Sequence, residues 1–459
     1  MVGGFYFLNE AEIHWILENI FVGNRLSRGE ARLEHGHTID LKAIRAPIIV
    51  FASHGDAITP PPQALNWIVD TYVDEQEIKI RGQRIIYMVH ESVGHLGIFV
   101  SSSVAKKEHT EMASILKLIE ALPPGLYEMV IEAKEGDGTH ARFQVDLKER
   151  HMTDILAIDG GGRAEEADFG AVARLSELAV ESYNLFGRPL VRALVTPAIT
   201  KTIHDMHPLR VQHRAMSDRM PGAAQLRSLA SAVTKDRRTV AADNPFSIAE
   251  AIMADLVEQC FDFTRDVRDA CFELTFFGIY GSPFMRWLGQ NHNFRRTHTG
   301  KDPLRYLPEV QSALGNISRG GLAEGVIRML ILVAEARESV RSSRLERAAY
   351  ALSNTEPFAS LGTEERARVI REQTLIVQFD LTAAISTLVD LLPDLDTRAI
   401  AVGTVDYIVG PVEEMEEHTV RAMQNLRCVL ELPPLRIPVE QPEPSSAGQP
   451  AIRLVAEGA

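Results

Sequence analysis

The 459-residue sequence contains only three cysteines, Cys260, Cys271 and Cys428, and no Cys-x-x-Cys pair. So sparse a set excludes a disulfide scaffold and a zinc ribbon, and it fits a reducing compartment. The first residues lack the positive start and long apolar run of a secretory signal, and no stretch approaches the roughly 18 apolar residues of a membrane span. The sequence therefore predicts a cytoplasmic protein without a membrane span.

Positive charge is also scarce, because 48 Lys and Arg face 62 Asp and Glu, for a formal net charge of -14. A protein that binds nucleic acid presents an excess of positive charge to the phosphates. We therefore expect no nucleic-acid partner.

The first third of the chain has an α/β pattern. Residues 47–52 and 85–89 are short apolar runs of the kind found in buried parallel strands. Between them, three prolines at 60–62 open a segment with helical apolar periodicity. Strand, helix and strand in this order predict one right-handed crossover and thus part of a parallel sheet.

Beyond this crossover the pattern changes twice. Residues 127–133 and 141–147 alternate around a Gly-Asp-Gly tip, which predicts a β-hairpin. From about residue 168 to residue 427 the apolar positions recur at helical spacing. The last residues, from 433, are rich in proline and serine and are predicted to be disordered.

Asp56 and His95 follow the two predicted strands. Consecutive parallel strands end at the same edge of a sheet, where open α/β sheets place their sites. A carboxylate there could orient an imidazole, and the imidazole could take a proton from a nucleophile. Two simpler explanations remain open, because Asp is common in turns and a loop histidine is often only solvated. His90 and Glu91 compete for the same role.

Residues 44–61, which contain Asp56, resemble the acid-loop segment of polyhydroxyalkanoate synthases, and residues 93–97 resemble their histidine loop. The chain is more similar still to uncharacterised bacterial proteins described as polyhydroxyalkanoate-synthase-like, and residues 9–24, 209–219 and 280–283 share this similarity. The resemblance implies an α/β-hydrolase domain followed by a long helical extension. It also implies that Asp56 is the catalytic acid and His95 the base.

Chemistry of this type requires a nucleophile on a Gly-x-Ser-x-Gly or Gly-x-Cys-x-Gly elbow, and the sequence contains none. The three cysteines lie in helical patterns, where we expect them to be buried. About 46 residues precede the first predicted strand, too few for the rest of a hydrolase sheet. The chain thus resembles the C-terminal part of a longer protein, whose upstream part supplies the nucleophile unless this form has lost it.

Residues 327–340 and 345–348 are similar to the paired helices of TerB-like domains of tellurite resistance, in which acidic residues bind a cation. Here Ala336 and Arg337 occupy expected acidic positions, and Glu335 and Glu338 are the carboxylates that remain. We therefore expect an ordinary helical bundle, with no metal and no cofactor.

The predicted fold class is α/β plus all-α, in which a partial α/β-hydrolase-like parallel sheet is followed by a helical bundle. The expected parts are a partial α/β-hydrolase-like domain (1–125), a β-hairpin connector (126–162), a helical extension (163–315), a TerB-like bundle (316–432) and a disordered tail (433–459). The leading function is chemistry on an acyl ester or thioester. The alternative is a non-catalytic helical interaction or regulatory module. Because an incomplete sheet exposes an edge strand, we also expect self-association or a partner chain there.

Overall fold

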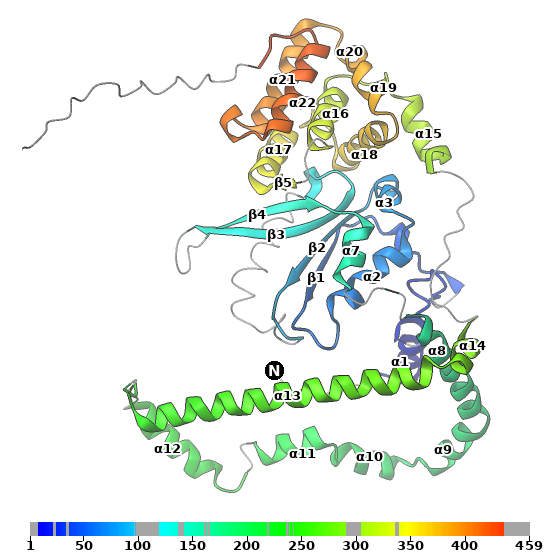
Figure 1. The fold of residues 1–459 in the computed structure, drawn as a ribbon, viewed down its shortest axis with the longest axis vertical. Coiled ribbons are helices and arrows are strands. Elements are labelled where there is room, and N and C mark those ends of the chain that lie inside the picture. The colour runs from blue at the N-terminus through cyan, green and yellow to red at the C-terminus, as the bar shows by residue number, and fades with distance from the viewer. Residues whose placement is uncertain are drawn as a thin grey trace, which may run out of the picture. The chain divides into compact units, whose positions relative to one another are not determined.

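The computed structural model describes residues 8–21, 24–33, 36–95, 97, 119–135, 142–159, 163, 166–217, 220–235, 237, 239–241, 243–290, 304–335 and 339–435. The chain divides into two compact units, one formed by residues 1–41 and 160–296 and the other by residues 42–159 and 297–459. Helices predominate, and one small mixed sheet accompanies them (Figure 1). Within the described part of the chain, no helix is long and apolar enough to cross a membrane.

The second unit contains the sheet. Its five strands lie in chain order: β1 (Ile48–Ser53), β2 (Arg84–His90), β3 (Gly125–Glu135), β4 (Arg142–Glu149) and β5 (Ser339–Arg341). β1, β2 and β3 are mutually parallel, whereas β4 and β5 continue the sheet in antiparallel pairing. The predicted strand, helix and strand are therefore confirmed, and the sheet is mixed rather than parallel throughout.

The crossover between β1 and β2 contains two helices, α2 (Pro61–Thr71) and α3 (Glu75–Arg81). The Asp74 side chain caps α3 by accepting a hydrogen bond from the backbone of Glu77, and Gly82 ends it with a φ of 71°. Leu65 and Ile68 of α2 pack on the sheet in one apolar cluster, together with α7 (Met152–Ile158). This packing fixes α2 against the face of the sheet.

The hairpin of β3 and β4 is part of the sheet, whereas the sequence pattern suggested a connector over residues 126–162. β3 pairs with β2 in parallel, and Leu126 lies opposite Ile85. Alternate residues of the hairpin, among them Met129 and Leu147, are buried in the sheet's second apolar cluster. These side chains need the sheet's cover, so the hairpin cannot serve as a free linker. Its predicted Gly-Asp-Gly tip lies outside the described residues.

The C-terminal helices belong to the same unit as the sheet, whereas the sequence pattern suggested a separate bundle from residue 316. The helices are α15 (Pro308–Gly315), α16 (Leu322–Glu335), α17 (Ser342–Asn354), α18 (Thr363–Phe379), α19 (Leu381–Ser386), α20 (Leu388–Leu391), α21 (Leu395–Val409) and α22 (Glu417–Val429). Short 3-10 turns in the described part of this unit are Ile119–Ala121 (η4), Leu304–Tyr306 (η8) and Val412–Glu414 (η9). A further turn, Leu41–Ala43 (η3), begins at the last residue of the first unit's N-terminal segment and continues into this one. α16 is buried along most of its length and forms the centre of the bundle.

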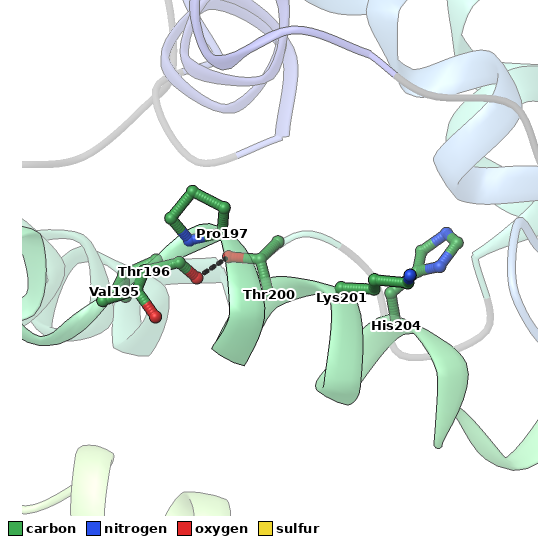
Figure 2. Close-up of a pocket in the computed structure, with 6 residues that line it drawn as sticks. All are labelled: Val195, Thr196, Pro197, Thr200, Lys201 and His204. Carbon is green, nitrogen blue, oxygen red and sulfur yellow. Dashed lines mark hydrogen bonds between the residues drawn. The ribbon is translucent and has the colours of Figure 1, made fainter.

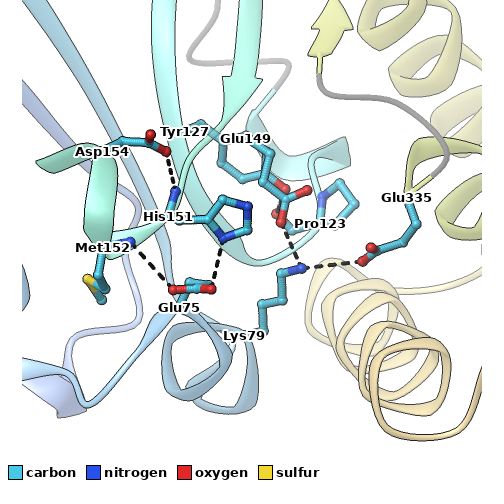
Figure 3. Close-up of polar contacts among 9 residues, drawn as sticks. All are labelled: Glu75, Lys79, Pro123, Tyr127, Glu149, His151, Met152, Asp154 and Glu335. Carbon is cyan, nitrogen blue, oxygen red and sulfur yellow. Dashed lines mark hydrogen bonds and ion pairs between the residues drawn. The ribbon is translucent and has the colours of Figure 1, made fainter. Parts of the chain in front are cut away.

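Lys79 ties the sheet to this bundle (Figure 3). Its Nζ on α3 lies 2.7 Å from Glu149 at the end of β4 and 3.3 Å from Glu335 at the end of α16. Burial lowers the pKa of Lys79, but the two carboxylates raise it by more, so that its pKa lies above the ordinary value. The same ion pairs engage Glu335, one of the carboxylates singled out by the TerB-like similarity, while residues 336–338 lie outside the described part.

The first unit joins residues 1–41 to the helical region, whereas the sequence pattern grouped residues 1–125. Its helices are α1 (Glu10–Ile16), α8 (Glu166–Ser182), α9 (Arg188–Leu194), α10 (Pro197–Asp205), α11 (Pro208–Ala215), α12 (Ala223–Lys235), α13 (Pro245–Tyr280) and α14 (Pro283–Gly289), with π-helical turns Leu17–Phe21 (η1) and Tyr183–Gly187 (η7). Glu10 pairs with Arg188 and Arg192 at 3.1 and 3.4 Å. Asp168, which is buried, accepts two hydrogen bonds from Arg286 of α14.

The 36-residue helix α13 has no buried residue in the described structure. It exposes many apolar side chains, including those of Leu256, Phe272 and Leu274. Cys260 and Cys271 on α13 are exposed, as is Cys428 on α22, so the prediction that the cysteines are buried is wrong. The reason is that helical periodicity reveals apolar positions without revealing whether a neighbour covers them. Of the predicted tail, residues 436–459 lie outside the described part.

Candidate functional site

The two loops that carry Asp56 and His95 leave the same edge of the sheet. Ser53 at the end of β1 lies opposite His90 at the end of β2, and the backbone N–H of His54 extends this pairing by donating to the His90 carbonyl at 2.9 Å. Because the two strands are parallel, the chain emerges from both in the same direction. The structure thus brings together the two residues that the sequence placed at this edge.

The side chain of Asp56 stabilises the turn that follows it. Its Oδ1 accepts hydrogen bonds from the backbone N–H groups of Ile58 and Thr59, at 2.8 and 2.9 Å, and its Oδ2 accepts one from the Thr59 hydroxyl at 2.8 Å. The residue is only 2% exposed. Burial raises the pKa of Asp56, but these bonds and one to His95 lower it by more, so that its pKa lies well below the usual range. The carboxyl group is therefore ionised at neutral pH.

His95 lies against this carboxylate, with 2.9 Å between its Nδ1 and Oδ2 of Asp56. The hydroxyl of Thr59 is 3.2 Å from the same nitrogen. An ionised carboxylate can only accept, so Nδ1 is the atom that carries the proton, and Nε2 of the neutral ring is left as an acceptor. The side chain is 39% exposed. An oriented, accessible imidazole with a free acceptor nitrogen is the arrangement that a general base requires.

The competing residues have other surroundings. Nδ1 of His90 accepts hydrogen bonds from the backbone N–H groups of Ser92 and Val93, both at 3.1 Å, so it shapes the turn that leads to His95. Glu91 is exposed in the same turn. Of these loop residues, His95 is the one that pairs with Asp56.

Sequence reasoning missed two residues of this site, Thr59 and Gly55. Thr59 contributes a backbone and a side-chain donor to Asp56, and an Asp followed three positions later by Thr is a recognisable pattern for such a turn. Gly55 lies so near Ser92 that no side chain fits there. That contact joins two loops 37 positions apart in the chain, and no local pattern reveals it.

Among the described residues, no group of three His, Cys, Asp or Glu side chains is placed to hold a metal ion. A surface hollow of about 570 Å³ lies along α10, and Figure 2 shows that its residues, Val195, Thr196, Pro197, Thr200, Lys201 and His204, come from that helix and the two residues before it. Because one helix surface forms all of it, the hollow does not enclose a ligand.

Comparison with known proteins shows the family to which this chain belongs. An uncharacterised protein of Rhizobium meliloti, described as "Uncharacterized protein in ackA 5'region", is 34% identical over 409 residues, which cover 85% of this chain and 55% of the relative. The chain thus spans about half the length of the curated relative it matches. No solved structure matches. A family model matches residues 1–310, which include the whole first unit and strands β1 to β4. The chain belongs to the family described as "Protein of unknown function (DUF3141)".

Proposed function

We propose that this chain supplies the acid and base of an α/β-hydrolase-type site that acts on acyl esters or thioesters. The observation that supports this proposal most directly is the 2.9 Å pair of Asp56 and His95 at the carboxyl edge of β1 and β2. The resemblance of both loops to those of polyhydroxyalkanoate synthases points to the same chemistry. Asp56 is the positioning acid and His95 is the general base.

The proposed reaction follows from this geometry. Nε2 of His95 takes the proton of a serine or cysteine nucleophile as that group attacks the carbonyl carbon of the substrate. Asp56 stabilises the imidazolium that forms, and His95 then returns the proton to the leaving alcohol or thiol. A second nucleophile, either water or an acceptor hydroxyl, releases the acyl group by the same proton transfers in reverse.

The nucleophile itself lies outside this chain in our proposal, because the sequence contains no Gly-x-Ser-x-Gly or Gly-x-Cys-x-Gly elbow. The relative from Rhizobium meliloti has room for one, since this chain covers 55% of it. We therefore propose that an upstream polypeptide segment brings the elbow to the edge of β1.

The experiment compares hydrolysis of an activated acyl ester by this chain alone and by this chain with the polypeptide encoded immediately upstream. We expect negligible turnover alone and clear turnover together. His95→Ala should abolish that turnover, whereas His54→Ala, in the neighbouring loop, should leave it nearly unchanged. If the two polypeptides together still turn over the ester when this chain carries His95→Ala, the proposal is refuted. Turnover by this chain alone that His95→Ala abolishes would show that the nucleophile lies within it.

A second candidate function, a helical interaction module, is favoured by the first unit. α13 contains seven Asp or Glu and two Arg, whereas α9 to α12 contain seven Lys or Arg and one acidic residue, Asp205. α13 also exposes many apolar side chains, and no residue of α9 to α12 is buried. Opposite charges and exposed apolar surface on one chain favour association with a second copy.

Light scattering after size exclusion tests this module directly. If this second function is correct, the molar mass of the protein in solution should be at least twice 50.9 kDa and should fall at high salt. Leu256→Glu with Leu274→Glu on α13 should give monomers, whereas Ile400→Glu, at an equally exposed position on α21, should not. A wild-type monomer at every protein concentration would exclude this function.

A further inference from the structure

The unit that contains the sheet also holds an apolar cavity, none of whose lining residues is Asp56 or His95. Its volume is about 90 Å³, and it lies between the turn η4 and helices α16, α17 and α21. Its walls are almost wholly apolar and include Ile327, Leu330, Ile331, Leu345, Ala348 and Ile408. The turn η4 comes just before the start of β3, whereas Asp56 and His95 follow the ends of β1 and β2. The cavity therefore lies at the opposite edge of the sheet from the candidate acyl site.

One cation lines this apolar cavity. Arg344, near the start of α17, is 6% exposed. Its Nε donates to the carbonyl of Val409 at 3.2 Å and its Nη2 to the carbonyl of Glu414 at 3.3 Å. The third nitrogen, Nη1, is buried and has no hydrogen-bond partner in the described structure. Thus Nε and Nη2 of the guanidinium have hydrogen-bond acceptors, both of them neutral carbonyls, and Nη1 has none among the described residues.

This arrangement leaves a buried positive charge with no ion-pair partner at contact distance among the described residues. Burial lowers the pKa of Arg344, and nearby Glu416, Asp146 and Glu414 act in the opposite direction without reversing the shift. No carboxylate among the described residues forms an ion pair with Arg344. A buried donor that makes no hydrogen bond destabilises the folded chain, and a buried charge does so more strongly. An anion that reached Nη1 would remove both penalties.

We propose that this cavity binds a short aliphatic carboxylic acid, with its carboxylate on Nη1 of Arg344 and its hydrocarbon tail against the apolar walls. A carboxylate is the planar anion that a guanidinium binds best, and the apolar walls favour a tail that inorganic anions lack. The cavity is smaller than the apolar cavity of about 150 Å³ that is known to hold benzene, so it fits a chain of about three or four carbon atoms. This proposal does not depend on the acyl chemistry at Asp56 and His95.

Calorimetric titration of the full chain with butyrate tests the proposal. We expect saturable binding of butyrate, and much weaker binding of butan-1-ol, which has the tail without the charge, and of inorganic phosphate, which has the charge without the tail. Absence of butyrate binding at millimolar concentrations would overturn the proposal. Equal binding of the alcohol would overturn it too, because Arg344 would then play no part in recognition.

Variants locate the site. Arg344→Met removes the charge and keeps much of the stem, and it should weaken butyrate binding about tenfold or more. Ala348→Leu fills the cavity without changing Arg344, so it keeps the test valid if Arg344→Met does not fold, and it should weaken binding to a similar degree. Arg347→Met is the matched control, because Arg347 also reaches the carbonyl of Val409 but lines a different hollow. Unchanged affinity in the folded Ala348→Leu variant, or equal loss in Arg347→Met, would contradict the assignment.

Discussion

The backbone of Gly55 lies against that of Ser92 so closely that a Cβ atom at Gly55 would come within 2.2 Å of the Ser92 carbonyl oxygen. Backbone atoms cannot move aside as a flexible side chain can, so a methyl group there must push the loop after β2 away from the loop after β1. Asp56 follows Gly55 directly, and His95 lies three residues beyond Ser92. The contact therefore sets the distance between the two candidate catalytic side chains.

Gly55→Ala should destabilise the sheet unit by about 1–3 kcal/mol, in the range of other substitutions that overpack a site. The matched control is Gly94→Ala, because a Cβ at Gly94 would meet only the Gly55 carbonyl oxygen at 3.9 Å, an ordinary contact. Urea unfolding of both variants measures the difference. Equal stability of the two variants would show that the two loops can separate without cost.

The Asp56 carboxylate should contribute to stability in a pH-dependent way. Its pKa in the folded chain is depressed below the unfolded value of about 3.9, so its contribution is present above about pH 4 and is lost as the pH falls toward the folded-state pKa. We expect Asp56→Asn to be less stable than the wild type by about 1–3 kcal/mol at neutral pH. This gap should narrow as the pH falls below about 4.

Denaturant unfolding across this pH range, down to the lowest pH at which both proteins fold, provides the measurement. Thr59→Val is the companion variant, because it removes one hydroxyl donor to Asp56 and leaves the backbone donors in place. Thr59→Val should lose less stability at neutral pH than Asp56→Asn does, and its loss should also shrink as the pH falls. A gap between wild type and Asp56→Asn that stays constant with pH would mean that the carboxylate charge does not matter to the fold.

The sequence predicted that Asp56 and His95 lie at one edge of the sheet, because each follows its own strand directly. The apolar runs at 47–52 and 85–89 each end in a polar loop, and parallel strands place such loops at one edge. The 2.9 Å contact between Asp56 and His95 follows from that rule. By contrast, the spacing between the loops depends on Gly55 and Ser92, which are distant in sequence, and no periodicity reports such a contact.

The same distinction explains the fold. The hairpin of β3 and β4 was predicted, but its role in the sheet depends on the pairing of Leu126 with Ile85, across some 40 intervening residues. The grouping of residues 1–41 with the helical region rests on contacts such as that of Glu10 with Arg188. These long-range partners are chosen by packing and charge, and a single sequence does not reveal them.

Lys79 should be important for the junction of sheet and bundle (Figure 3). Its Nζ is buried between Glu149 and Glu335, so Lys79→Met leaves two carboxylates near each other without their shared cation. Because both carboxylates are partly exposed, we expect a loss of about 1–3 kcal/mol, less than for a fully buried pair. The pKa of Lys79 is raised, so its contribution is complete below the unfolded value of about 10.4 and is lost as the pH rises through the folded-state pKa.

Thermal and urea unfolding of Lys79→Met, compared with Arg421→Met, measure this effect. Arg421 pairs with Glu417 on the exposed surface of α22, where an ion pair contributes little. The loss in Lys79→Met should shrink above about pH 10, as the wild-type amine loses its proton. If both variants lose equally little stability, Lys79 does not hold the bundle to the sheet.

Arg328 is the largest fully buried side chain among the described residues of the bundle, and its hydrogen-bond partners are neutral acceptors. It donates to the Gln373 side chain at 2.7 Å, to the Thr387 hydroxyl at 2.8 Å and to the Ile317 carbonyl at 2.6 Å. Burial lowers the pKa of Arg328 to about 10, although Glu324 and Asp390 act to raise it. The charge is therefore unfavourable in this position, while the hydrogen bonds that it makes are favourable.

Two variants separate these opposing contributions. Arg328→Met removes the charge but leaves its acceptors without a donor, so we expect a loss of about 2–4 kcal/mol, because each buried acceptor left unpaired costs about 1–3 kcal/mol. Adding Gln373→Leu removes one of those acceptors and should recover part of the loss, although Gln373→Leu alone deprives Arg328 of a partner and should destabilise. A double-mutant cycle from urea unfolding gives the coupling energy, which should be at least about 1 kcal/mol. Strict additivity of the two changes would show that Arg328 stabilises the bundle through packing alone.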